Sequence, residues 1–446
     1  MYGLAVLVAV ASMLVTAPRA SAQLVSAPSD QPTSSQEISP VGPYQEGVPF
    51  GGWMLFPSLT VGGVYDSNFN QSASGTDRDS GGSARVAPRL VATHTDGAIH
   101  STSIYGVGDL RFFNANTISA DAGITHTYQP MPDLSFNGNF RYTRETDLFT
   151  SALNFNNNAI GPPGQGGPAV TPPPVINPFG TTPVVNPIAY NQFTAGGSVQ
   201  KTFGQGFASI TATAFHITYD HSDDVLPPFN TSHDGTAIWL SGRVGYHFVP
   251  SLYGFAEVTG VWQRFNNSIF DTNGYRLLGG LGTDEPNSLV RAEVYGGYQF
   301  QHQQQDFFVP GFSQDANSSV FGGRLYYYPT RYWTLIASVD EALSMSTLLQ
   351  PNLPPGSPVL VTTAILQTTY AISQQWSIGA RVGYTRADYF NFDRLDNGWM
   401  VGASFNYEIW RNLSLTLDYQ YSTNHANVAL NNFSRNTYTA GLTYRY

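Results

Sequence analysis

The sequence predicts an all-β protein. We expect a transmembrane antiparallel up-and-down β-barrel of about 18 strands, with 16 as the alternative count, short periplasmic turns and long extracellular loops. Three observations support this prediction: apolar residues recur at every second position, connections alternate between short and long, and charge is scarce beside aromatic residues. Charged residues make up 11% of the chain and aromatic residues 14%, whereas about a quarter of an average soluble domain is charged.

The N-terminal segment has the pattern of an export signal. An apolar run from Leu4 to Val15, too short for a transmembrane helix, is followed by Ala20-Ser21-Ala22. Residues 23–50 are rich in Ser, Pro and Gln, as disordered linkers are. We therefore expect a signal peptide over 1–22, a disordered periplasmic linker over 23–50, and a barrel over 51–446 in the bacterial cell outer membrane.

The alternation of period two begins at Trp53 and predicts strands with two different faces. One example is the alternation of Ile238, Leu240, Gly242, Val244, Tyr246 and Phe248 with Trp239, Ser241, Arg243, Gly245 and His247. Eighteen such segments begin near residues 53, 83, 100, 118, 134, 190, 208, 236, 252, 273, 289, 318, 333, 359, 376, 397, 413 and 436.

The connections between these segments separate a barrel from a soluble sandwich. Tight links such as 204–206, 249–251 and 410–412 carry Gly, Pro or Asn, and long stretches lie between most of them. A sandwich has no reason to keep short turns on one rim and long loops on the other, whereas outer-membrane barrels have that arrangement. Closure also removes edge strands, which would otherwise aggregate.

Aromatic residues near the strand ends agree with a membrane barrel, in which they gather at the lipid interface. We expect the following to lie at the periplasmic interface: Trp53, Tyr246, Phe248, Tyr326, Tyr328, Trp333, Trp376, Ile409 and Trp410. The last strand carries Gly441, Tyr444 and the terminal Tyr446. This ending resembles the assembly signal of bacterial outer-membrane barrels, and it predicts the barrel-assembly machinery as a partner.

Three segments resemble the putative β-barrel porin 2 family of Gram-negative bacteria: Val61–Asn70, Arg85–Leu90 and Tyr105–Phe113. The likeness extends over about Trp53 to Tyr446. It implies an outer-membrane location and a porin-like barrel, and it says little about the transported solute. Asp66–Asn70 also resembles the start of a calcium loop, but the Gly and Glu expected at positions six and twelve are missing, so we expect an ordinary turn there.

The sequence contains few signs of catalytic chemistry, so we expect no enzyme, cofactor or metal. Without Cys, thiolate metal sites and cysteine nucleophiles are excluded. No His pair has zinc-helix spacing, and neither a Gly-x-Ser-x-Gly elbow nor a phosphate loop occurs. His94 and His216 have Ser residues nearby, but we interpret both as hydrogen-bonding groups. The net charge of −10 argues against nucleic acid as a partner.

Charged residues on the polar face of the strands are the candidates for a pore lining. They are Arg85, Arg89, Arg111, Arg141, Arg243, Arg276, Arg291, Arg324 and Arg381 with Asp109, Asp121, Glu145, Glu257, Glu293, Asp340, Glu408 and Asp418. One interpretation is a pore wall whose opposed charges orient polar solutes. The other is mutual pairing that only stabilises the sheet, and the sequence leaves both open.

Two loop features complete the expectations. Residues 148–200 contain no charge and many Pro and Gly residues, so this connection either folds inward or lies disordered outside. The other long loops are acidic, which suggests contact with lipopolysaccharide through divalent cations. We expect a porin-like channel for passive diffusion of small polar solutes. The alternatives are an exopolysaccharide export channel and a non-conducting structural or adhesion barrel.

Overall fold

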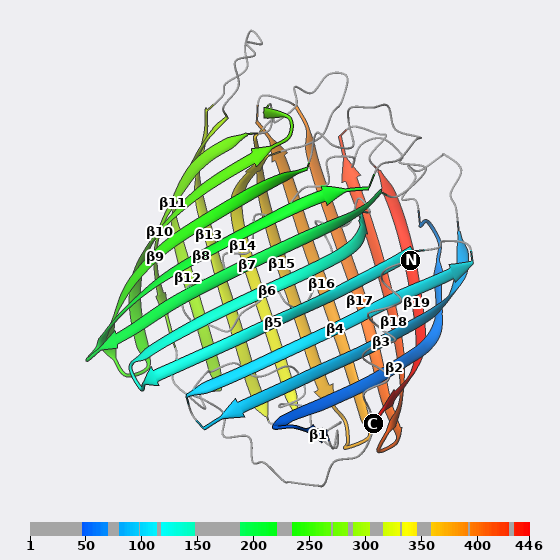
Figure 1. The fold of residues 1–446 in the computed structure, drawn as a ribbon. Coiled ribbons are helices and arrows are strands. Elements are labelled where there is room, and N and C mark those ends of the chain that lie inside the picture. The colour runs from blue at the N-terminus through cyan, green and yellow to red at the C-terminus, as the bar shows by residue number, and fades with distance from the viewer. Residues whose placement is uncertain are drawn as a thin grey trace.

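The computed structural model describes residues 47–446 except 70–79, 98, 114–116, 148–187, 221–233, 269–270, 284–288, 304–314, 331, 346–357, 391–392 and 428–431. Within these limits the chain forms one antiparallel sheet of nineteen strands, which closes on itself into a barrel (Figure 1). None of the described residues belongs to a helix long and apolar enough to cross a membrane. The predicted all-β barrel is therefore confirmed.

The strands follow one another in chain order around the barrel. They are β1 Val48–Phe50, β2 Trp53–Asp66, β3 Gly81–Asp96, β4 His100–Phe113, β5 Thr117–Met131, β6 Leu134–Asp147, β7 Ile188–Phe203, β8 Gly206–Tyr219, β9 Gly235–Val249, β10 Leu252–Phe265, β11 Thr272–Gly282, β12 Val290–Gln303, β13 Asp315–Thr330, β14 Trp333–Met345, β15 Pro358–Ala371, β16 Trp376–Tyr389, β17 Leu395–Trp410, β18 Leu413–Ala426 and β19 Phe433–Arg445. β2 to β19 are the eighteen predicted strands. The largest difference in a starting position is three residues, at β13 and β19.

The first strand of the barrel wall is covered along both edges. β2 pairs with β3 on one edge and, from Ser58 to Asp66, with β19 on the other. β19 leaves Trp53–Leu55 uncovered, and β1 pairs with these three residues through a turn at Gly51 and Gly52, whose φ angles are 53° and 89°. β1 lies at the end of the segment expected to be a linker; residues 23–46 are outside the described residues.

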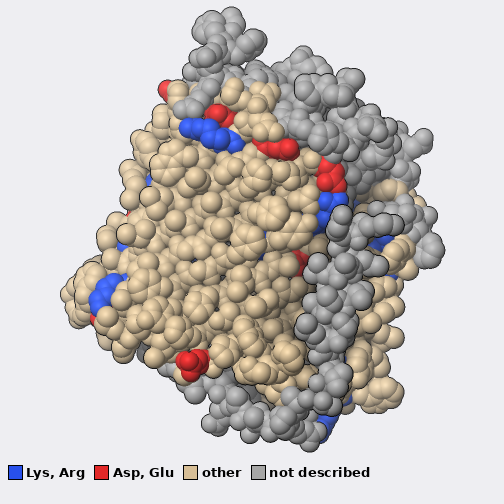
Figure 2. All heavy atoms as spheres, in the orientation of Figure 1, with Lys and Arg blue, Asp and Glu red and all other residues tan. Residues whose placement is uncertain are grey.

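The outer face of the wall is apolar. Ile210, Val244 and Val294 point outward and are each more than half exposed. Figure 2 shows the result on one side of the molecule, a broad band without charged side chains between charged patches at its two ends. Outward-facing ion pairs lie near strand ends: Lys201 with Asp133 on the periplasmic side, and Arg386 with Asp388 on the extracellular side. This is the surface that a bilayer requires of a barrel.

Aromatic side chains flank the apolar band at both ends. Trp376 packs against Tyr407 on the periplasmic side with ring centroids 4.5 Å apart, and Tyr384 against Trp399 on the extracellular side at 4.7 Å. Trp376 and Tyr384 are eight positions apart on β16, which corresponds to a height of about 20 Å for a tilted strand. The expectation for Tyr326 was wrong: it alternates in phase with Arg324 and is buried inside the barrel.

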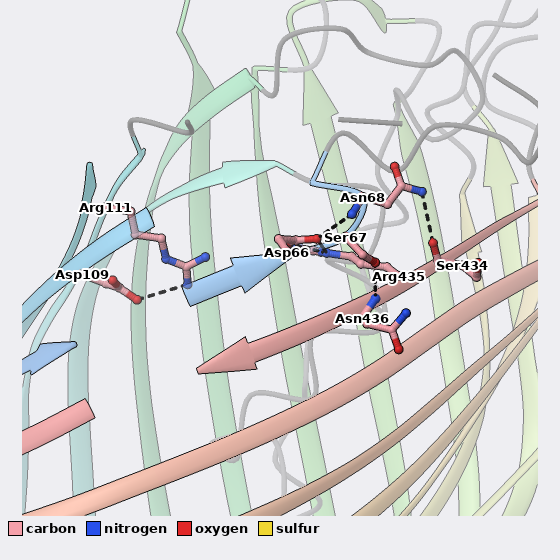
Figure 3. Close-up of polar contacts among 8 residues, drawn as sticks. All are labelled: Asp66, Ser67, Asn68, Asp109, Arg111, Ser434, Arg435 and Asn436. Atoms are coloured by element: carbon pink, nitrogen blue, oxygen red, sulfur yellow. Dashed lines mark hydrogen bonds and ion pairs between the residues drawn. The ribbon is translucent and has the colours of Figure 1, made fainter. Parts of the chain in front are cut away.

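A polar latch closes the barrel between its first and last strands (Figure 3). Arg435 Nε donates to both carboxylate oxygens of Asp66, at 3.0 and 2.8 Å. Ser67 N donates to Asn436 O at 3.0 Å, and Asn436 N donates to Ser67 Oγ at 2.8 Å. Asn68, fully buried, donates through Nδ2 to Ser434 O at 3.2 Å. Asp66, Ser67 and Asn68, which belong to the segment that resembled a calcium loop, thus join β2 to β19.

Candidate functional site in the barrel interior

One part of the interior carries ion pairs whose side chains are partly exposed. Arg85 donates to Asp109 at 3.1 Å, and Arg111 donates to the other oxygen of the same carboxylate at 3.3 Å. Arg141 contacts Asp121 with two hydrogen bonds, at 2.9 and 2.7 Å. These residues come from β3 to β6, where alternation directs them to the face opposite the apolar one.

A matching set lies across the seam on β16 to β19. Arg381 contacts both oxygens of Asp418, at 2.9 and 2.8 Å, in the bidentate geometry that makes charge-assisted bonds strong. Arg445 donates to Glu408 at 2.7 Å. We call the interior faces of β2 to β6 and β16 to β19 the polar wall. Sequence reasoning assigned the charged residues of these five pairs to this face except Arg445, and it also missed the inward-facing Asp66 and Arg435. The alternation of the last strand could have revealed Arg435 and Arg445.

Arg89 differs from the other arginines of the polar wall because none of the residues that the structure describes pairs with its charge. Its side chain is exposed inside the barrel, and it forms no hydrogen bond or ion pair with the residues that the structure describes. In the ladders Ser58 of β2 lies opposite Arg89 on one side and Arg445 on the other. Since Glu408 engages Arg445, Arg89 supplies an excess positive charge at this level of the barrel.

A second part of the interior, on β9 to β12, is packed rather than open. Arg243 contacts Glu293 at 3.0 Å and Glu257 at 3.4 Å, and Tyr253 donates its hydroxyl to Glu293 at 2.7 Å. The side chains of Arg243, Glu257 and Glu293 are only 3%, 2% and 2% exposed. They point inward as predicted, but such burial is incompatible with the expected pore-lining role.

Apolar side chains surround this buried charge cluster. Phe255 lies under Arg243, whose guanidinium carbon is 3.5 Å from the ring centroid, and it packs with Tyr253, Leu278, Tyr295 and Val320. Farther toward the extracellular side, Trp239 belongs to a second buried cluster and stacks on Phe215 at 4.7 Å. We call these clusters the packed wall. The sequence carries a sign of this packing, since the apolar residues Phe215, Ile217 and Tyr219 occupy alternate positions on the inward face of β8.

The remaining candidates are distributed between and beyond these walls. Arg276 donates to Asp340 at 3.2 Å, and Arg291 and Arg324 point inward and are partly exposed. The side chain of Glu145 and the 148–187 connection lie outside the described residues. In the last strand Gly441 faces inward and is buried, while Tyr444 and Tyr446 point outward and are exposed.

The two histidines examined for catalysis are on the outer surface. His94 Nδ1 is 2.7 Å from the backbone oxygen of Gly52, and its ring packs against Trp53 at 5.2 Å. His216 Nδ1 is 2.9 Å from Thr236 Oγ1. Each therefore has the hydrogen-bonding role that the sequence suggested. Among the described residues no group of three or more His, Asp or Glu is arranged to hold a metal ion.

Comparison with known proteins gives a family and a set of similar folds. A family model described as putative β-barrel porin 2 matches residues 174–446, whereas no curated protein matches the chain. The similar solved structures include OpdL of Pseudomonas aeruginosa, with a TM-score of 0.42, 9% identity, and coverage of 89% of this chain and 99% of that one. Another is a BenF-like porin of Pseudomonas fluorescens Pf-5, with a TM-score of 0.43, 9% identity, and coverage of 88% and 99%.

Proposed function

Because this chain belongs to the putative β-barrel porin 2 family, we propose that it is an outer-membrane channel for passive diffusion of small polar solutes. The observation that carries the proposal is the polar wall, a set of partly exposed ion pairs that spans adjacent strands on both sides of the β2–β19 seam. Barrels of 16 to 18 strands are wide enough to hold an aqueous channel.

The polar wall suits uncharged or singly charged solutes. Opposed charges held a few ångströms apart create a local field that orients dipolar molecules, while their pairing limits the net charge that an ion experiences. Arg89 adds a positive charge that no neighbour within the described part of the chain neutralises. We therefore propose a weak preference for anions among charged solutes.

The outer face supports proposals for the partners. The apolar band between the aromatic girdles would contact the lipid, and lipopolysaccharide would lie against its extracellular end. Tyr444 and Tyr446 are exposed on the outer face of the last strand, where the barrel-assembly machinery could recognise them before the barrel closes.

A swelling experiment tests the proposed function. Proteoliposomes that contain the folded barrel, loaded with an impermeant polymer, should swell in isotonic solutions of small polar solutes such as glycine or arabinose. The rate should fall as solute size increases. Matched liposomes with heat-unfolded protein serve as the control. Equal, slow swelling in both preparations would contradict a channel and favour the non-conducting structural barrel, with which the buried packed wall also agrees.

A further inference from the structure

Two neighbouring strands separate before their ends. The ladder between β13 and β14 runs from Thr330 and Trp333 to Gly322 and Asp340, where it stops. β13 nevertheless continues to Asp315 along β12, and β14 continues to Met345 along β15. A long connection precedes Asp315 and another follows Met345, whereas a short turn joins β13 to β14 at their opposite ends. The separation is therefore on the extracellular side.

Beyond Asp340, β14 lies on the inner face of the barrel. Gln299 of β12 donates to Leu343 O at 2.9 Å and accepts from Leu343 N at 3.1 Å, and Gln301 donates to the same oxygen at 3.2 Å. Both glutamines point inward, and β12 is separated from β14 by β13 in the sheet. Leu343 is completely buried. This end of β14 therefore passes across the inner side of β13.

Further contacts hold the strand where it leaves β13. Tyr295 of β12 donates its hydroxyl to Asp340 at 2.5 Å. Arg276 of β11 donates to Asp340 at 3.2 Å and to the backbone oxygen of Glu341 at 3.4 Å. The side-chain amide of Gln299 thus satisfies both backbone groups that Leu343 would otherwise present to a strand partner.

We propose that residues 341–345 of β14, the inner segment, form a gate at the extracellular end of the channel. In the closed state, which the structure represents, Gln299 and Gln301 hold the inner segment inside the barrel and narrow it. In the open state the segment returns to the wall and extends its ladder with β13 in the existing register, with Ser319 opposite Leu343. The backbone N–H and C=O groups of Leu343 are hydrogen-bonded in both states, to Gln299 when the gate is closed and to β13 when it is open. This proposal rests on the proposed channel function.

Because the chain has no Cys, engineered cysteine pairs can report both states. Ser319 is exposed on the outer face and Leu343 is buried inside, so a disulfide in Ser319→Cys/Leu343→Cys can form only when the gate opens. The control is Leu325→Cys/Ala337→Cys, residues that face each other in the intact part of the ladder. We expect rapid cross-linking of the control and slow cross-linking of the test pair. Adding Gln299→Ala and Gln301→Ala should increase the cross-linking rate of the test pair and leave that of the control pair unchanged.

If the glutamine variants fold poorly, Tyr295→Phe replaces them, because it removes only the hydroxyl bond to Asp340. A test pair that fails to cross-link in either background, while the control pair reacts, would overturn the gate. Single-channel recordings give the second readout: the oxidised test pair should conduct more than its reduced form. An unchanged conductance in a conducting channel would overturn the gating role and leave the channel standing. Absence of conductance in every variant would instead reject the channel, and with it the gate.

Discussion

At the scale of residues, the buried ion pair of Asp66 and Arg435 joins β2 to β19, the first and last strands of the barrel wall, beside their backbone ladder. Both side chains are about a tenth exposed, and the two are 369 positions apart in the sequence. The sequence showed no sign of this pair, because Asp66 was expected in an ordinary turn and because pairing depends on which strands become neighbours. For the same reason the sequence left open whether Arg243 lines a pore or only pairs with acidic residues of neighbouring strands.

Removing Arg435 should therefore destabilise the folded barrel strongly. Arg435→Leu leaves the carboxylate of Asp66 buried without its partner, which costs about 3–5 kcal/mol. The loss should appear as a lower urea midpoint for conversion of the heat-modifiable folded form. Arg386→Leu is the matched control, since its pair with Asp388 is about half exposed and such pairs contribute about 0–1 kcal/mol. Equal midpoints for the two variants would contradict the latch.

At the scale of elements, strands are the best-predicted feature because a wall between lipid and interior forces strict alternation. Eighteen strand positions followed from this rule. β1 was not predicted, since a strand of three residues is too short to show an alternating pattern. The inward course of β14 was not predicted either, because its inner segment has the residue alternation of a wall strand. Contacts from other strands, such as those of Gln299 and Gln301, hold it inside.

Neighbouring residues on β5 provide a direct test of the two faces. Ile124 points outward near the middle of the strand, and Thr125 points inward; both are exposed. Ile124→Arg places a charge in the lipid and should cost about 2–4 kcal/mol near the bilayer midplane. Thr125→Arg should change the free energy of unfolding much less. Unfolding by urea in lipid vesicles measures both, and equal losses would mean that the faces of β5 are assigned wrongly.

At the scale of the whole molecule, the interior is divided rather than uniformly polar. The packed wall fills the side formed by β8 to β12, and the polar wall lies on β2 to β6 and β16 to β19. The sequence predicted an inner face on which positive and negative residues are nearly equal in number. It could not predict the division, because burial inside a barrel depends on how the closed wall curves and on what packs across it.

The division leads to the central claim, that solutes pass along the polar wall. The most direct test is the reversal potential of purified protein in a planar bilayer under a salt gradient. Arg89→Glu should shift this potential clearly toward cation preference, since an exposed charge on the path sets the local ion concentration. The control is Glu257→Gln, which changes the charge of the packed wall by +1 and should leave the reversal potential nearly unchanged because this carboxylate is buried. Equal effects of the two substitutions, or the absence of any conductance, would contradict the claim.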